Sequence, residues 1–215
     1  MMRQRRIGRV LRAVMAPAAA AVATVALAGC FMIPLADGRS PFDDPFGPSF
    51  TEVRAQLPAL QEALDEALTG DDWAAQAVVA SDNCEGACNL RLGIDLAPSS
   101  ASAEDAVAAA PDAASSGWLD LAVPPETLSA ILEAGAPVAA DAKRDLTVSA
   151  RCLGEAVTDA TGAEVTVCAD LTDIAQAITG SDDDYFDGPF FSAAPDEITL
   201  RTSTWAVDEI LSRIE

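Results

Sequence analysis

Histidine is absent from all 215 residues of the chain, which removes the side chain most often used for acid-base catalysis and metal binding. A Ser-His-Asp triad, a Cys-His protease pair and a His-ligated zinc site are therefore excluded. The sequence also lacks a Gly-x-Ser-x-Gly elbow, a phosphate-binding glycine loop and a Ser-x-x-Lys motif. The chemistry that stays open is that of carboxylates and cysteines.

Four carboxylates gather before a turn glycine, at Asp182, Asp183, Asp184 and Asp187. Closely spaced carboxylates of this kind can surround a calcium ion. However, an EF-hand register that starts at Asp183 places Tyr185 at the third position and Ala194 at the twelfth, where a bidentate acid is needed. We therefore expect a solvated acidic loop and no metal or cofactor, with calcium binding as the alternative.

The first 30 residues have the order of charge and hydropathy of an export signal. Five arginines lie between residues 3 and 12, and an alanine-rich apolar stretch follows over 13–28. This stretch is too short for a comfortable membrane span. It ends in the box Leu27-Ala28-Gly29-Cys30.

This arrangement resembles the signal peptide of bacterial lipoproteins. The resemblance implies cleavage before Cys30, a diacylglycerol on its thiol, further acylation with a fatty acid such as palmitate, and a lipid anchor in the cell membrane on its extracytoplasmic side. An uncleaved signal anchor is the alternative. The residues after Arg5-Arg6 do not fit the twin-arginine pattern, which favours the general secretory route without settling it.

The charge of the chain excludes one class of partner. The net charge is −21, and removal of residues 1–29 takes away five arginines and no acidic residue. The mature chain then has 8 basic against 34 acidic side chains, a net charge of −26. Such a body is repelled by nucleic acid and by anionic lipid headgroups, so we expect no nucleic-acid binding and attachment to the membrane only through the lipid.

Composition divides the chain into three parts. Residues 1–29 form the predicted signal peptide, and 30–49 form the lipidated cysteine and a proline-rich tether. As a coil, this tether spans on the order of 25 Å. Residues 50–215 form the extracytoplasmic domain, whose half-hydrophobic composition supports a folded core.

Periodicity predicts an α+β domain, with an antiparallel sheet and helices packed on one side. Ser49 and Glu52 form a capping-box pattern before a helix that ends at Gly70, with Pro58 as a kink or as part of the true first turn. Further helices are expected over 102–110, from Pro124-Pro125 to Gly135, from Thr172 as N-cap to Gly180, and at the C-terminus. Strands are expected over 73–81, 90–96, 118–123, 145–153, 164–169 and 197–202.

Three tryptophans, Trp73, Trp118 and Trp205, are expected to pack in the core or at its rim, with a sugar-stacking platform as the alternative.

The order of these elements suggests an internal repeat. Apolar residues from Leu119 to Leu132 match those from Ile198 to Leu211 at a constant offset of 79. The element order also resembles the ferredoxin-like split βαβ arrangement. We therefore consider two ferredoxin-like halves, 50–123 and 124–215, with chance matching of buried faces as the alternative.

Four cysteines lie beyond Cys30, and in an exported domain two disulfides are the expected outcome. Cys152 and Cys168 lie eight residues on either side of Ala160, inside the predicted turn 159–162. Cys84 and Cys88 flank Gly86 in the same way. We therefore predict the pairs Cys84–Cys88 and Cys152–Cys168, each closing its own hairpin.

Three classes of function remain. The sequence favours a non-enzymatic lipoprotein that binds a protein or an envelope component, because the anchor is strongly encoded and no catalytic constellation is. A carrier of a small ligand or lipid is the alternative, and a large cavity lined by leucine, isoleucine and valine would distinguish it. An enzyme that uses carboxylates or calcium is the third class. With 34 acidic residues in the chain, the spacing of any two of them does not identify a catalytic pair.

The lipobox leads to a direct test. Changing Cys30→Ala removes the thiol that would receive the lipid, so we expect the variant to incorporate no radiolabelled palmitate and to keep its signal peptide. Cys152→Ala serves as the matched control, because it removes a thiol outside the lipobox. Normal labelling of the Cys30 variant would show that the chain is not a lipoprotein.

Overall fold

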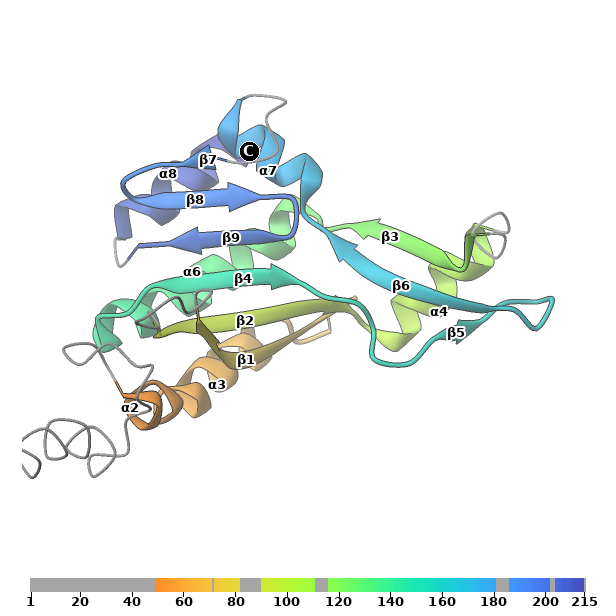
Figure 1. Ribbon diagram of the computed structural model, residues 1–215, viewed down its shortest axis with the longest axis horizontal. Helices are drawn as coiled ribbons and strands as arrows, with labels where there is room; N and C mark the ends of the chain where they lie inside the picture. Colours follow the sequence, from red (N-terminus) through yellow and green to blue (C-terminus); the bar gives the residue numbers. More distant parts are fainter. Residues whose placement is uncertain are drawn as a thin grey trace, which may run out of the picture.

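The computed structural model describes residues 49–70, 72–81, 90–110, 116–180, 186–201 and 204–214 (Figure 1). The fold is α+β, as predicted. It consists of a six-stranded sheet with helices on one face and a smaller three-stranded sheet that extends from it. Cys30, Cys84, Cys88 and Asp182–Asp184 lie outside the described residues, so the predictions made for them stay predictions.

The large sheet is mixed rather than antiparallel. Its order is β1-β2-β4-β9-β8-β7, and all neighbours are antiparallel except β2 and β4, which are parallel. The strands are β1 (Trp73–Ser81), β2 (Leu90–Pro98), β4 (Leu146–Ala150), β7 (Phe186–Asp187), β8 (Phe191–Ala194) and β9 (Glu197–Leu200). The expectation of an antiparallel sheet fails at this one pair, because a long connection over residues 99–145 that contains helices brings the chain back beside β2, and such a crossover makes the two strands parallel.

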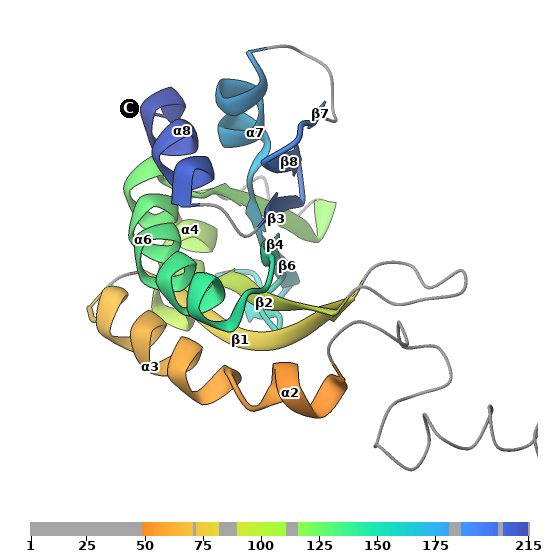
Figure 2. The same ribbon diagram turned by 90° about the vertical axis from the view of Figure 1, so that its left-hand side faces the viewer.

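Helices cover one face of this sheet, as predicted. Figure 2 shows α3 (Leu57–Ala67), α6 (Pro125–Ala142) and α8 (Thr204–Ile214) side by side on that face. The interface is filled by fully buried aliphatic side chains from both layers, among them Leu92, Ile94, Leu128, Ile131, Leu132 and Ile198. Trp73 is also buried, so its predicted packing role is confirmed. None of the helices in the described ranges has both the length and the hydropathy needed to span a bilayer.

Local capping signals position the first helices. Ser49 and Glu52 form the predicted capping box at the start of α2 (Phe50–Arg54), with the Ser49 N–H donating to Glu52 Oε2 at 2.7 Å. Pro58 lies in the first turn of α3, where its missing N–H costs no hydrogen bond. The predicted single helix is therefore two helices that meet at residues 55–56.

Gly135 does not end the helix that contains it. Helix α6 continues through Gly135 and Pro137 to Ala142 and ends at Lys143, which has a φ of 54°. An added Cβ at Gly135 would lie 3.0 Å from Leu146 Cδ2 and 3.2 Å from Ile94 Cδ1. The prediction was wrong because the glycine serves close packing of helix on sheet, not helix termination.

The cap of α7 (Thr172–Thr179) also differs from the prediction. Leu171, not Thr172, is the N-cap residue. The N–H and hydroxyl of Thr172 both donate to Asp170 Oδ1, at 2.9 and 2.6 Å. A carboxylate two residues upstream therefore holds the start of this helix, and Gly180 ends it with a φ of 65°, as predicted.

The two strands of the first predicted hairpin pair along their whole length, and those of the second pair only in part. β1 and β2 pair antiparallel from Trp73↔Pro98 to Ser81↔Leu90. The run predicted as one strand over 145–153 instead splits. β4 stays in the large sheet, and the chain then crosses to the small sheet, where β5 (Val157–Thr158) pairs with β6 (Glu164–Asp170).

The two ferredoxin-like halves do not form. β2 from the first half pairs with β4 from the second, and β3 (Trp118–Ala122) pairs with β6. β3 and β9, which the offset of 79 would make equivalent, lie in different sheets. Segments 50–123 and 124–215 are therefore interleaved in one fold.

The tight contact at Gly135 leads to a stability prediction. Gly135→Leu would force side-chain atoms into the filled space between α6 and the sheet, and we expect it to lower the unfolding free energy by roughly 2 kcal/mol. Glu133→Leu, at an exposed position of the same helix, is the matched control and should change stability by less than about 0.5 kcal/mol. Denaturant unfolding measures both, and equal stability of the two variants would contradict the close packing.

Candidate functional site

The small sheet and one helix form a projection that we call the arm. The arm consists of α4 (Ser100–Ala109), β3, β5 and β6, in the sheet order β3-β6-β5. It lies at the end of the molecule opposite α2 (Figure 1). Among the described residues, its core is separate from the main one and contains four buried residues, Ala103, Val107, Val165 and Val167. So small a core needs further support.

A disulfide supplies that support. Cys152 and Cys168 are bonded, with an S–S distance of 2.03 Å, which confirms one of the two predicted pairs. Next to the bond, the Leu153 N–H donates to the Val167 carbonyl and the Ala169 N–H donates to the Arg151 carbonyl. The bond thus fixes the chain at the point where it passes from the large sheet into the arm.

The tip of the arm is the predicted turn 159–162. The Asp159 carboxylate accepts hydrogen bonds from the N–H groups of Ala163 and Thr161, at 2.7 and 2.9 Å, and from the Thr161 hydroxyl. The Ala163 N–H first, and the Thr161 hydroxyl second, lower the pKa of Asp159 below its ordinary value. Because the folded pKa is lowered, this carboxylate supports the turn above its unfolded pKa and loses that effect as pH falls through the folded one.

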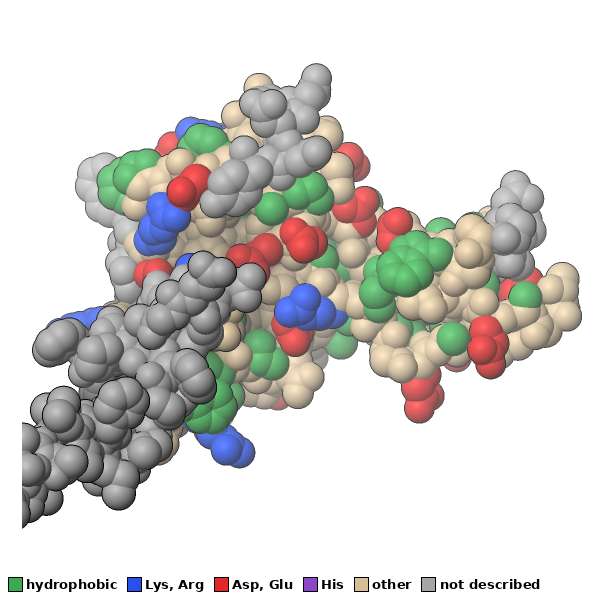
Figure 3. All heavy atoms as spheres, viewed as in Figure 1, with side chains coloured by type: hydrophobic (Ala, Val, Ile, Leu, Met, Phe, Trp, Pro, Cys, Tyr) green, Lys and Arg blue, Asp and Glu red, His purple; other side chains and the backbone are tan. Residues whose placement is uncertain are grey.

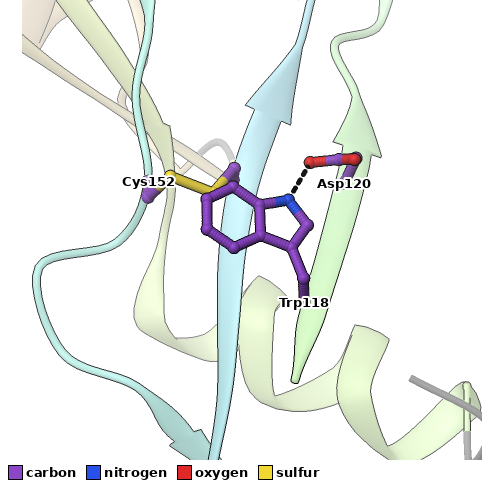
Figure 4. Close-up of a disulfide and its surroundings, with 4 residues drawn as sticks. Trp118, Asp120 and Cys152 are labelled. Carbon is purple, nitrogen blue, oxygen red and sulfur yellow. Dashed lines mark hydrogen bonds between the residues drawn. A yellow bond between two sulfur atoms is a disulfide. The ribbon is translucent and has the colours of Figure 1, made fainter. Parts of the chain in front are cut away.

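Trp118 is the most distinctive residue of the arm. Its side chain is 49% exposed, and its indole N–H donates to Asp120 Oδ1 at 2.6 Å. Figure 4 shows the indole nitrogen directed toward the Asp120 carboxylate, with both side chains on β3. The prediction that Trp118 packs into a core or its rim was therefore wrong. The exposed ring and its carboxylate neighbour instead form a surface that can contact a ligand.

β3 forms one edge of the small sheet. Among the described residues, only β6 pairs with it. Its five residues alternate between exposed and half-buried, with Trp118, Asp120 and Ala122 exposed. An edge strand with exposed side chains offers both backbone and side-chain groups to a partner.

A groove lies on the other side of the arm, between α4 and residues 153–160. Its volume is about 560 Å³, within the range of small-molecule sites. Val107, Leu153 and Val157 contribute apolar surface to it, while Glu104 and Glu155 contribute carboxylates. This mixed lining differs from the purely aliphatic cavity expected of a lipid carrier.

The polar face of the large sheet is hydrogen-bonded within itself. Thr147 Oγ1 and Thr199 Oγ1 are 2.9 Å apart and both residues are buried. Arg91 Nη1 donates to Thr199 Oγ1, which also lies within hydrogen-bond distance of Glu197 Oε1. The two threonine hydroxyls thus bond mainly to groups of the same face, so this face is a weaker candidate for binding than the arm.

The structure brings together few of the residues that the sequence singled out. Of the four aspartates of the acidic loop, only Asp187 is described, and its carboxylate forms an ion pair with Arg201. The described ranges contain no group of three or more acidic or cysteine side chains placed to hold a metal ion. The arm surface was missed, although the alternating run Trp-Leu-Asp-Leu-Ala already placed Trp118 and Asp120 on one face of a strand.

The chain matches no protein-family model, no curated protein and no solved structure.

Because the core of the arm is small, we expect the disulfide to be the main stabiliser of the arm. Replacing both Cys152 and Cys168 with alanine frees a loop with a sequence separation of 16, and we expect a loss of about 3 kcal/mol in unfolding free energy. Hydrogen exchange should accelerate in β5 and the 159–163 turn, while β1 and β2 retain their slow exchange. Uniform acceleration in both sheets, or none, would contradict the separate core.

Proposed function

We propose that the chain is a membrane-anchored extracytoplasmic lipoprotein, and that its folded domain is a non-enzymatic module that binds a protein or another envelope component through the arm. The lipobox at Cys30 supports the anchor, and the arm supports the binding role. The single observation that carries the proposal is the position of the arm at the end of the molecule opposite α2, where the described chain begins (Figure 1).

This position relates the binding surface to the proposed anchor. The tether would connect the membrane to Ser49 at the start of α2. Its span of on the order of 25 Å keeps that end of the domain near the bilayer. A projection at the opposite end would then reach furthest into the envelope, where a partner could approach it.

The surface of the arm supports a partner that is recognised by charge and by aromatic contact. Figure 3 shows acidic side chains and a hydrophobic patch on the visible face of the arm, and the basic side chains in this view lie on the main body. Segments 99–123 and 153–170 hold eight acidic residues and no lysine or arginine. Exposed aromatic groups with adjacent polar groups are typical of binding hot spots.

The packing of the main core favours this proposal over a lipid carrier. The interface between the sheet and the helices is the place where a carrier would enclose its ligand. In the described residues that interface is filled, and Leu92, Ile94 and Leu128 are fully buried there. A ligand would have to displace close-packed side chains, at a cost of several kcal/mol.

In vivo photocrosslinking tests the proposal. A photoreactive amino acid at Glu164, exposed on β6, should give a discrete crosslinked product in intact cells. The same group at Glu66, exposed on α3, is the matched control and should not. The product should disappear in a Trp118→Ala background and fall when Cys30→Ala removes the anchor. Crosslinking from Glu66 but not from Glu164 would place the binding surface elsewhere and refute the role of the arm.

A further inference from the structure

We propose that the free edge of β3 binds an extended segment of a partner protein as an additional strand, and that this segment alternates basic and apolar residues. The inference rests on the proposed function and specifies the chemistry of its partner. It follows from the backbone of β3, the two faces of the strand and the charge of the arm.

The backbone of β3 alternates between its two sides. The Thr166 N–H donates to the Gly117 carbonyl and the Val123 N–H donates to the Asp170 carbonyl. In this parallel register, the odd-numbered residues of β3 bond to β6, and the even-numbered ones point to the free edge. Ser116 Oγ already engages the N–H and carbonyl of Trp118. The N–H and carbonyl groups of Asp120 and Ala122 are thus the ones presented to an incoming strand.

Unlike β3, the edge strand β1 has its outer backbone groups covered by a side chain. β1 is the terminal strand of the large sheet. There the Gln61 side chain donates to the Ala75 carbonyl at 3.0 Å and accepts from the Ala77 N–H at 2.8 Å. One amide thereby occupies the positions that a further strand would use, which protects the edge from pairing. In the described residues, β3 has no comparable side chain beyond Ser116.

The two faces of β3 define which side chains the added strand would carry. Trp118 and Asp120 lie on the open face, where a basic side chain could stack on the indole and approach the carboxylate. Leu119 and Leu121 lie on the face toward α4 and are only half-buried against the small core. Apolar residues of the added strand would complete their burial. Because side chains alternate along a strand, the partner segment must alternate basic and apolar residues.

The negative charge of the arm favours a positively charged partner segment and argues against a second copy of this chain. The eight acidic residues of the two arm segments have no basic neighbour within those segments. Two such arms would repel each other when their β3 edges met, whereas a segment with lysine or arginine would be attracted.

An apolar depression continues the edge beyond the end of β3. It has a volume of about 260 Å³ and is lined mainly by small and aliphatic residues, with Asp173 as its acidic member. Ala122 belongs to both the strand edge and this depression, together with Val123, Pro125 and Ile174. A strand on β3 could therefore place one apolar side chain in it as an anchor.

Titration with a defined peptide tests the inference. The probe is a blocked nonapeptide of alternating arginine and valine, added to the full mature protein in non-ionic detergent. We expect the backbone amide signals of Asp120 and Ala122 to shift in NMR spectra, and the affinity to fall as salt rises. A peptide with glutamate in place of arginine should not bind. Arginine-valine peptide with N-methyl groups on alternate residues should bind at least tenfold more weakly, because it cannot form the strand hydrogen bonds.

Two variants separate the backbone from the side-chain contribution. Ala122→Pro removes an outward N–H without touching the bonds to β6, and should weaken binding at least tenfold. Asp120→Asn should weaken it several-fold and reduce its salt dependence. Unchanged circular dichroism and unchanged exchange in β6 establish that both variants are folded.

Equal binding of the N-methylated peptide, or shifts confined to residues outside β3, would overturn the inference. If the arginine-valine peptide does not bind while crosslinking from Glu164 persists, strand addition is wrong and the binding role of the arm stands. If both fail, the proposed function is wrong as well.

Discussion

The Cys152–Cys168 bond is the interaction on which the arm depends. Four buried residues give too little apolar burial to offset the chain entropy of ordering three strands and a helix. The bond restricts the unfolded arm and also fixes the crossing from β4 to β5. The arm can therefore project from the domain with its β3 edge exposed, instead of packing that edge against the main core.

The main core has the complementary role of a rigid base. Helices α3, α6 and α8 cover one face of the large sheet, and the close approach of α6 at Gly135 leaves no room for a ligand there. At the base of the arm, the Arg151 side chain pairs with Asp95 of β2 at 3.0 Å, although both groups are partly exposed and the pair contributes little to stability. The positional accuracy of the arm thus comes from backbone pairing and the disulfide.

Local signals in the sequence predicted the features that depend on neighbouring residues. The capping box at Ser49, the first-turn Pro58, the pairing of β1 with β2, the turn at Asp159 and the Cys152–Cys168 pair were all correct. The errors arose where distant contacts decide. The sequence around Gly135 predicts a helix end because the packing partners of the glycine lie on other elements. The pattern over 145–153 predicts one strand because a continuous β-branched run does not reveal a change of sheet. The second hairpin is also less symmetric than predicted. Four residues separate Cys152 from Val157 on one side, but only two separate Val165 from Cys168 on the other. Trp118 was misplaced because alternation does not indicate which face of a strand is covered.

The central claim is that the outer edge of β3 is open. Residue-resolved amide hydrogen exchange of the oxidised protein, without any ligand, measures this most directly. Leu119 and Leu121 bond to β6 and should exchange slowly, whereas Asp120 and Ala122 point to the edge and should exchange much faster. Slow exchange at all four amides would show that the edge is already covered and would contradict the account.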